Sequence, residues 1–184
     1  MGIMIEDGKG TGKNAEVDSE NHLVVNAVSQ SVEHWVNHVK GTAWNILFAA
    51  TPTGAGDCFF YLKNTGDEDI VVEGMWLKVA ADEYFDVNIN DTGTPIGGTA
   101  ITPVNLNSGS GTSPTITLQQ GNDITGLTAG NTAVRLYHAS STGSTNYNFD
   151  QDIILKKNGV LTLYCQTGTT ALAGMLVINE HSKA

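Results

Sequence analysis

Short runs of β-branched and aliphatic residues recur along the chain from Trp44 onward, and residues typical of turns separate them. We expect ten strands, at Trp44–Thr51, Cys58–Lys63, Ile70–Ala80, Tyr84–Asn90, Thr99–Leu106, Thr115–Gln119, Ala133–Ala139, Tyr147–Leu155, Val160–Gln166 and Leu172–Asn179. Short strands at this spacing predict an all-β, jelly-roll-like antiparallel β-sandwich. A closed barrel is the alternative.

The first forty residues follow a different pattern. Residues 1–22 have no core-forming periodicity and predict an extended N-terminal arm, so that residues 23–184 form a single β-sandwich domain. The first strand is expected at Leu23–Ser29. Residues 30–40 are the one segment with helical spacing, because apolar side chains fall on one face at Val32, Trp35, Val36 and Val39.

The strongest turn signal is the pair Asn158-Gly159, which lies between two apolar runs. Both central residues of a type I′ turn need a positive φ, and Asn and Gly adopt it most readily. The pair therefore predicts a tight β-hairpin.

Charge is distributed unevenly. Residues 91–149 carry three formal charges, at Asp91, Asp123 and Arg135, within a segment rich in Thr, Gly, Ser and Asn. Such polar composition is typical of disorder, but the recurring apolar runs favour stacked short strands. A neutral surface rich in hydroxyl and amide groups suits an assembly or glycan-contacting protein better than an enzyme.

The net charge of −10 and the 184-residue length limit the function classes. No basic patch is present that would release counterions from nucleic acid, so we expect no nucleic-acid binding. Met1–Glu6 lacks the features of a secretory signal, and no apolar run is long enough to span a membrane. We expect a protein made in a cytoplasm, with no membrane partner.

Three short patterns suggest a ligand site and are better explained otherwise. Gly8–Lys13 resembles a phosphate loop, but Asp7 and Asn14 occupy positions where that motif needs Gly and Ser or Thr. The alternation Asp86, Asn88, Asn90 resembles a calcium loop, yet it also fits a half-exposed strand. His34 and His38 have helical metal-ligand spacing without a third ligand, so we expect no metal and no cofactor.

The two cysteines, Cys58 and Cys165, lie in apolar runs and predict buried free thiols, with a single disulfide as the alternative. Neither has neighbours that would lower its pKa, and no nucleophile elbow is present. We therefore expect no enzymatic activity. A pair of carboxylates that hydrolyses a glycan is brought together by the fold, so the sequence alone does not test for one.

Aromatic residues divide between core and surface. Trp44 and Trp76 lie within strand-like runs and are expected in the core. Trp35 and Tyr147 lie in more exposed contexts, and they are the candidates for stacking on a glycan.

Several phrases of the chain resemble small virion proteins of tailed bacteriophages, of the head-decoration, cement or appendage type. The phrases are Ile5–Gly8, Gly12–Asp18, Asn21–Val25, Gly41–Asn45, Gly98–Asn107, Gly159–Leu161 and Asn179–His181. The resemblance implies a jelly-roll-like sandwich that assembles on the phage particle, often as a trimer. It leaves head, neck and tail open as locations.

The expected function is accordingly that of a capsid decoration or cement protein, a homotrimer bound to the major capsid protein or another virion protein. An arm can add a strand to a neighbouring subunit. The candidate docking residues are Ile3, Ile5, Lys9, Lys13, Val17, Trp35 and His38. The alternative is a neck-, tail- or fibre-associated virion protein that binds host glycan through Trp35 and Tyr147.

Overall fold

The computed structural model describes residues 16–17, 23–24, 35–140 and 143–181, with only the backbone described for 16–17, 23–24, 150 and 151. The chain divides into two units, residues 1–31 and residues 32–184. In the first, strands β1 (Glu16–Val17) and β2 (Leu23–Val24) form a short antiparallel ladder in which Val17 pairs with Leu23. The second unit contains the sandwich.

The second unit begins with a helical turn, η1 (Val36–Lys40), inside the range predicted for a helix. Its strands are β3 (Ala43–Ala50), β4 (Cys58–Asn64), β5 (Asp69–Val79), β6 (Glu83–Ile89), β7 (Thr92–Ile96), β8 (Thr99–Ala100), β9 (Val104–Asn105), β10 (Ile116–Gln120), β11 (Thr125–Thr128), β12 (Asn131–His138), β13 (Ser144–Leu155), β14 (Val160–Cys165) and β15 (Leu172–His181). The predicted all-β sandwich is confirmed.

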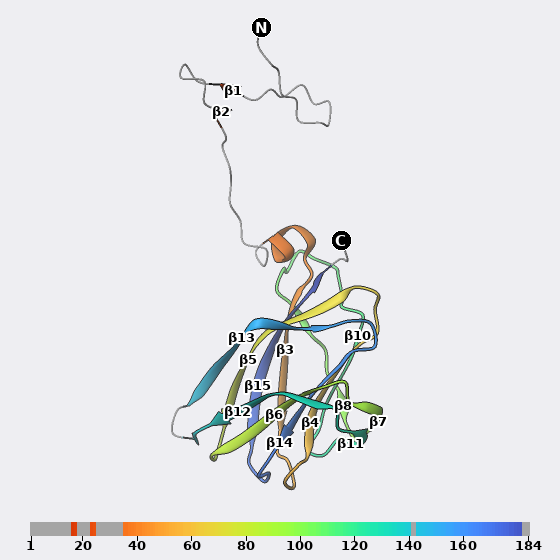
Figure 1. Cartoon of the computed structure of the whole chain (residues 1–184), viewed down its shortest axis with the longest axis vertical. Coiled ribbons are helices and arrows are strands. Elements are labelled where there is room, and N and C mark those ends of the chain that lie inside the picture. Colours follow the sequence, from red (N-terminus) through yellow and green to blue (C-terminus); the bar gives the residue numbers. More distant parts are fainter. Residues whose placement is uncertain (1–15, 18–22, 25–34, 141–142, 182–184) are drawn as a thin grey trace. The chain divides into compact units, whose positions relative to one another are not determined.

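Eight of these strands form a jelly roll of two antiparallel sheets (Figure 1). One sheet has the order β13-β5-β15-β3, and the other has the order β12-β6-β14-β4. Among the eight, the first strand pairs with the last, the second with the seventh, the third with the sixth and the fourth with the fifth. This nested pairing defines a jelly roll, in which a long hairpin is folded over into two sheets.

Alternation along each strand builds the core between the sheets. On β3, for example, Trp44, Ile46 and Phe48 point inward and are buried, whereas Leu47 is 61% exposed. The rings of Phe48 and Phe60 lie 4.9 Å apart between centroids, and Phe48 therefore contacts the opposite sheet. Burying aromatic and branched side chains from both sheets supplies the main stabilisation of the sandwich.

The neutral segment is largely one insertion between β6 and β12. It contributes the ribbon of β7 and β11, extends one sheet through β10 and β8, and adds β9 beside β3. The predicted single strand Thr99–Leu106 is wrong, since β8 and β9 belong to different sheets. The insertion also contains β7 and β11, which the sequence did not predict as strands.

Two further expectations are corrected. Asn158 has a positive φ of 67°, but Gly159 does not, and β13 and β14 lie in different sheets. Asn158-Gly159 therefore connects the two layers and forms no hairpin. Trp44 is buried as expected, whereas Trp76 is 36% exposed because it lies on the outer face of β5.

Candidate functional site

One candidate surface lies where η1 meets the loop after β9. Gly41 ends the helical turn at a φ of 65°, and its carbonyl oxygen accepts hydrogen bonds from Asn105 Nδ2 at 2.8 Å and Ser110 Oγ at 3.1 Å. Asn107 Nδ2 donates to the Asn37 carbonyl at 2.9 Å. These bonds fix the loop against the helical turn, so that the side chains at this end keep a defined arrangement.

This end exposes apolar side chains, and we call the set of Trp35, His38, Val39 and Leu106 the apical surface. Trp35 is 41% exposed and Val39 is 59% exposed, while Val36 on the same turn is buried. The Lys40 ammonium lies 4.9 Å from the centre of the Trp35 ring, a cation–π distance. An exposed indole beside apolar neighbours is typical of a protein contact.

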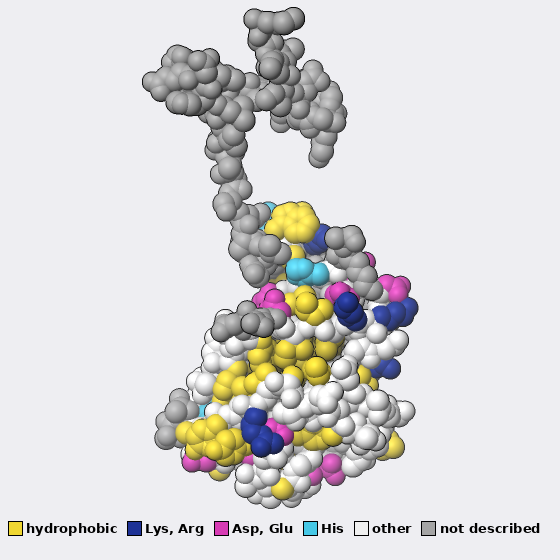
Figure 2. Space-filling view, in the orientation of Figure 1, with side chains coloured by type: hydrophobic (Ala, Val, Ile, Leu, Met, Phe, Trp, Pro, Cys, Tyr) yellow, Lys and Arg dark blue, Asp and Glu magenta, His cyan; other side chains and the backbone are white. Residues whose placement is uncertain are grey.

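A second candidate is an apolar groove along the open edge of the sandwich, between β12 and β13. Val134 and Leu136 line it from β12, and Tyr147 and Ile153 line it from β13; all four side chains are partly buried against the core. The groove has a volume of about 630 Å³. Hydrophobic side chains form a band across the middle of the sandwich between the strands labelled β13 and β12 in Figure 1 (Figure 2).

The groove continues along the edge of the sandwich. A neighbouring hollow of about 590 Å³ shares Ala133, Asp152 and Ile153 with it and extends to the turn before β14. Both bordering strands are the last of their sheets. The edge therefore combines exposed core side chains with strand edges at which another chain can pair.

Two polar contacts hold the sheets together at this edge. The Tyr147 hydroxyl donates to the Tyr137 carbonyl at 2.8 Å, and His138 Nε2 lies 3.0 Å from the Leu77 carbonyl oxygen. Burial raises the pKa of Tyr147. Its hydroxyl is thus engaged within the protein, and only part of its ring faces the groove.

A buried carboxylate, Asp91, fastens the insertion to the outer face of the sheet β12-β6-β14-β4. Its two oxygens accept hydrogen bonds from the Gly130 amide at 2.8 Å, the Thr162 hydroxyl at 2.8 Å and the Tyr164 hydroxyl at 2.6 Å. Ile124, which also belongs to the insertion, packs in a small buried hydrophobic cluster that is separate from the main core. One of the three charges of the neutral segment is therefore structural.

The cysteines are buried and free, as predicted. Burial raises the pKa of Cys58 to about 12 and that of Cys165 to about 11, so both thiols stay protonated near neutral pH. A protonated thiol is a poor nucleophile. Within the described ranges, no three His, Cys, Asp or Glu side chains gather into a group suited to a metal ion.

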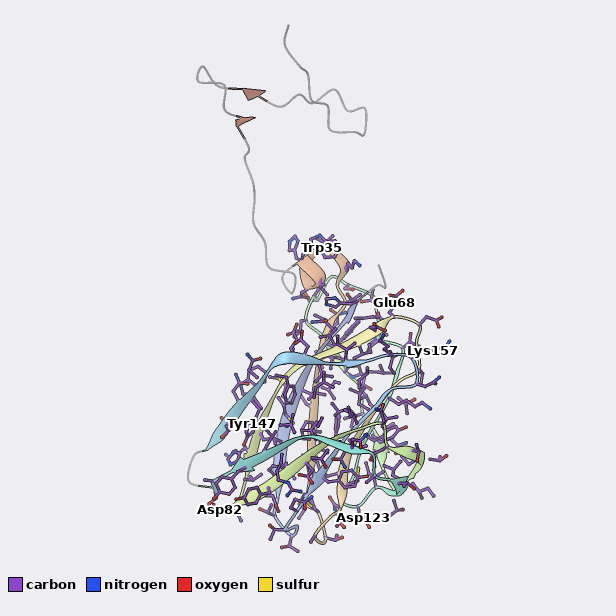
Figure 3. The ribbon with its side chains drawn as sticks, in the orientation of Figure 1. Trp35, Glu68, Asp82, Asp123, Tyr147 and Lys157 are labelled. Atoms are coloured by element: carbon purple, nitrogen blue, oxygen red, sulfur yellow. The ribbon has the colours of Figure 1, made fainter. Side chains whose placement is uncertain are left out.

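The structure separates the residues predicted for sites. Ile3, Ile5, Lys9 and Lys13 lie outside the described residues, and Val17 lies in β1. Trp35 and His38 are both exposed and both belong to the apical surface. Trp35 and Tyr147, the predicted glycan contacts, lie at different parts of the domain and do not form one site (Figure 3).

Sequence reasoning missed the groove, whose lining comes from β12 and β13. Val134 and Leu136 alternate with polar residues on β12, as they do on any strand with a buried face. Their partial exposure results from the opening between two edge strands. That opening depends on which strands end each sheet, and the alternation pattern contains no such information.

Comparisons with protein-family models, with curated proteins and with solved structures find no match to this chain. Among the residues that the structure describes, none belongs to a helix with the length and hydrophobicity needed to cross a bilayer.

Proposed function

We propose that this protein is a structural component of a tailed-bacteriophage virion, namely a decoration or cement protein that binds the outer surface of the head as a homotrimer. The observation that carries the proposal is the groove between β12 and β13, where core side chains remain open to solvent. A subunit with such an edge gains stability when a neighbour covers it.

Two other observations support this function. The sequence phrases described above resemble small virion proteins of tailed phages, and the jelly roll is a frequent architecture of viral capsid proteins. The fold alone does not define a function. The sequence resemblance and the open edge are therefore the observations that connect this fold to the proposed virion function.

The two surfaces have separate roles in this proposal. The groove is the contact between copies of the chain, and the apical surface contacts the major capsid protein through Trp35 and His38. The predicted arm, with Ile3, Ile5, Lys9, Lys13 and Val17, adds to the contact with the capsid. Three copies bind together, so weak individual contacts add up through raised effective concentration.

The oligomeric state tests the groove contact. Ala133 is exposed and lines both hollows of the edge, so Ala133→Glu places a charge in the contact without disturbing the core. Size-exclusion chromatography with light scattering should show a trimer for the natural chain and a monomer for this variant. Ala49→Glu, at an exposed position of β3, is the matched control and should stay trimeric.

Binding to the purified heads of the phage that encodes the protein tests the second role. Trp35→Ala should weaken co-sedimentation with heads and leave the trimer intact, because the indole is at the apical surface and not in the groove. A natural chain that stays monomeric at all concentrations and does not sediment with heads would refute the proposed function.

A further inference from the structure

The insertion covers only one half of the outer face of the sheet β12-β6-β14-β4. The insertion lies over β14 and β4, where Asp91 and Ile124 fasten it. On β6 and β12 the outward side chains of Tyr84 and Tyr137 remain exposed, whereas the outward Asp86 and Asn88 of β6 are buried. At the lower left of Figure 2, a hydrophobic patch there adjoins a basic side chain.

Two tyrosines form the centre of this open half. Tyr84 on β6 and Tyr137 on β12 are direct cross-strand partners, and their ring centroids lie 4.8 Å apart with an interplanar angle of 42°. Each residue is 49% exposed. The pair therefore offers aromatic surface to solvent.

Hydrogen bonds hold the groups around the rings in place. The Tyr137 hydroxyl donates to Asp82 at 3.1 Å, and the same carboxylate accepts from the Ser140 amide at 2.8 Å. Beside the rings, Arg135 donates through Nε and Nη2 to Asp86, at 2.6 and 2.8 Å. A site whose side chains are already fixed loses little conformational entropy when a ligand binds.

The remaining hydrogen-bonding groups define the ligand's chemistry. Arg135 is 58% exposed, and its Nη1 amino group has no acceptor among the described residues. The Tyr84 hydroxyl and Gln166 Oε1 are likewise without a partner in that part of the chain, while Gln166 Nε2 donates to Asp86. The site thus offers donors and an acceptor beside aromatic surface.

The charges around the rings exclude an acidic ligand. Asp86 neutralises Arg135, and Asp82 adds a further negative charge. The whole chain carries −10. An anionic glycan or an acidic peptide would therefore meet net repulsion here, although a single guanidinium is present.

We propose that Tyr84, Tyr137 and Arg135 form a binding site for a neutral pyranose glycan. The C–H face of a sugar ring packs on the tyrosines, and its hydroxyl groups bond with Arg135 Nη1, the Tyr84 hydroxyl and Gln166 Oε1. Two rings and one guanidinium present much less area than the ~800 Å² that each partner buries in a stable protein interface. The small, fixed site favours a saccharide over a protein.

The site is independent of the proposed virion role and differs from the glycan contacts predicted from the sequence. Trp35 lies elsewhere on the domain, and Tyr147 lines the groove and contacts Tyr137 through a hydrogen bond from its hydroxyl to the Tyr137 backbone carbonyl. The test uses the full chain and saturation-transfer difference NMR with three probes: methyl α-mannopyranoside, methyl β-galactopyranoside and methyl β-glucopyranoside. At least one should show transfer to its ring C–H protons, with a Kd of roughly 1 mM.

Variants locate the binding. Tyr84→Ala and Tyr137→Ala should each weaken it about tenfold, a loss typical of a stacking contact. Tyr84→Leu keeps an apolar side chain without a flat ring and should also bind weakly, which separates stacking from folding. Trp76→Ala is the matched control, because Trp76 is a part-exposed aromatic on the opposite sheet, and its binding should equal that of the natural chain.

Three outcomes would overturn the assignment. The first is the absence of transfer to any of the three probes at about 10 mM. The second is unchanged binding in both Tyr→Ala variants. The third is tighter binding of polygalacturonate than of the neutral probes.

Discussion

Removal of the Asp91 carboxylate should loosen the insertion from the sandwich. Asp91 is 5% exposed and accepts three hydrogen bonds, and Thr162, one of the donors, is completely buried. Each bond to a charged acceptor contributes about 1.5–3 kcal/mol, and contributions within one network are not additive. Asp91→Ala should therefore lower the free energy of unfolding by roughly 3–5 kcal/mol.

The isosteric change is milder. In Asp91→Asn the carbonyl oxygen can still accept from Gly130, and the two hydroxyl groups can rotate to accept from the new amide, so the loss should be about 1–2 kcal/mol. Asp123→Asn is the matched control, because Asp123 belongs to the same insertion and is exposed (Figure 3). Its effect should stay below about 0.5 kcal/mol.

Urea unfolding followed by tryptophan fluorescence measures these differences. Hydrogen exchange at β11 adds a local measure, since its amides should exchange faster in Asp91→Ala while those of β5 and β15 change least. If Asp91→Ala costs no more than Asp123→Asn, the carboxylate does not fasten the insertion, and the account of how the neutral segment folds is wrong.

Two further predictions concern the core. Cys58 and Cys165 should react with a thiol reagent at pH 8 only on unfolding. Burial raises both pKa values above their ordinary value of 9.0, to about 12 for Cys58 and about 11 for Cys165. The contribution of the protonated thiols to the free energy of unfolding should therefore be complete below pH 9 and decline as the pH rises toward those values. A titration that finds either thiol reactive in the folded protein would contradict this. Gly174→Ala should cost about 1–3 kcal/mol in urea unfolding, because its Cβ would overlap with the Phe48 ring, whereas Gly111→Ala has open space and should cost almost nothing. Equal effects of the two changes would refute the close contact.

Strand positions could be predicted from the sequence wherever one face is buried. On β5, for instance, Met75, Leu77 and Val79 are buried while Trp76 and Lys78 are exposed, and this alternation marks the strand clearly. It does not distinguish an aromatic on the outer face from one in the core, which is why Trp76 was misplaced. The β7–β11 ribbon was missed because it buries almost no side chain and contains Gly and Pro.

Contacts between distant strands could not be predicted in the same way. Asn158-Gly159 is a good local hairpin signal, yet the strands on either side separate into different sheets because each pairs with partners far away in the sequence. The groove and the Tyr84–Tyr137 pair depend on the same long-range pairing. Local propensity identifies elements, and the tertiary pairing that places sites is decided by the packing of the whole core.

Cryo-electron microscopy of phage heads incubated with the protein tests the central claim most directly. The proposed function predicts added density at repeated, symmetry-related positions on the outer surface of the head, as three-fold assemblies that contact one another through the β12–β13 edge. Density confined to a single vertex or to the tail, or heads that acquire no density, would contradict it.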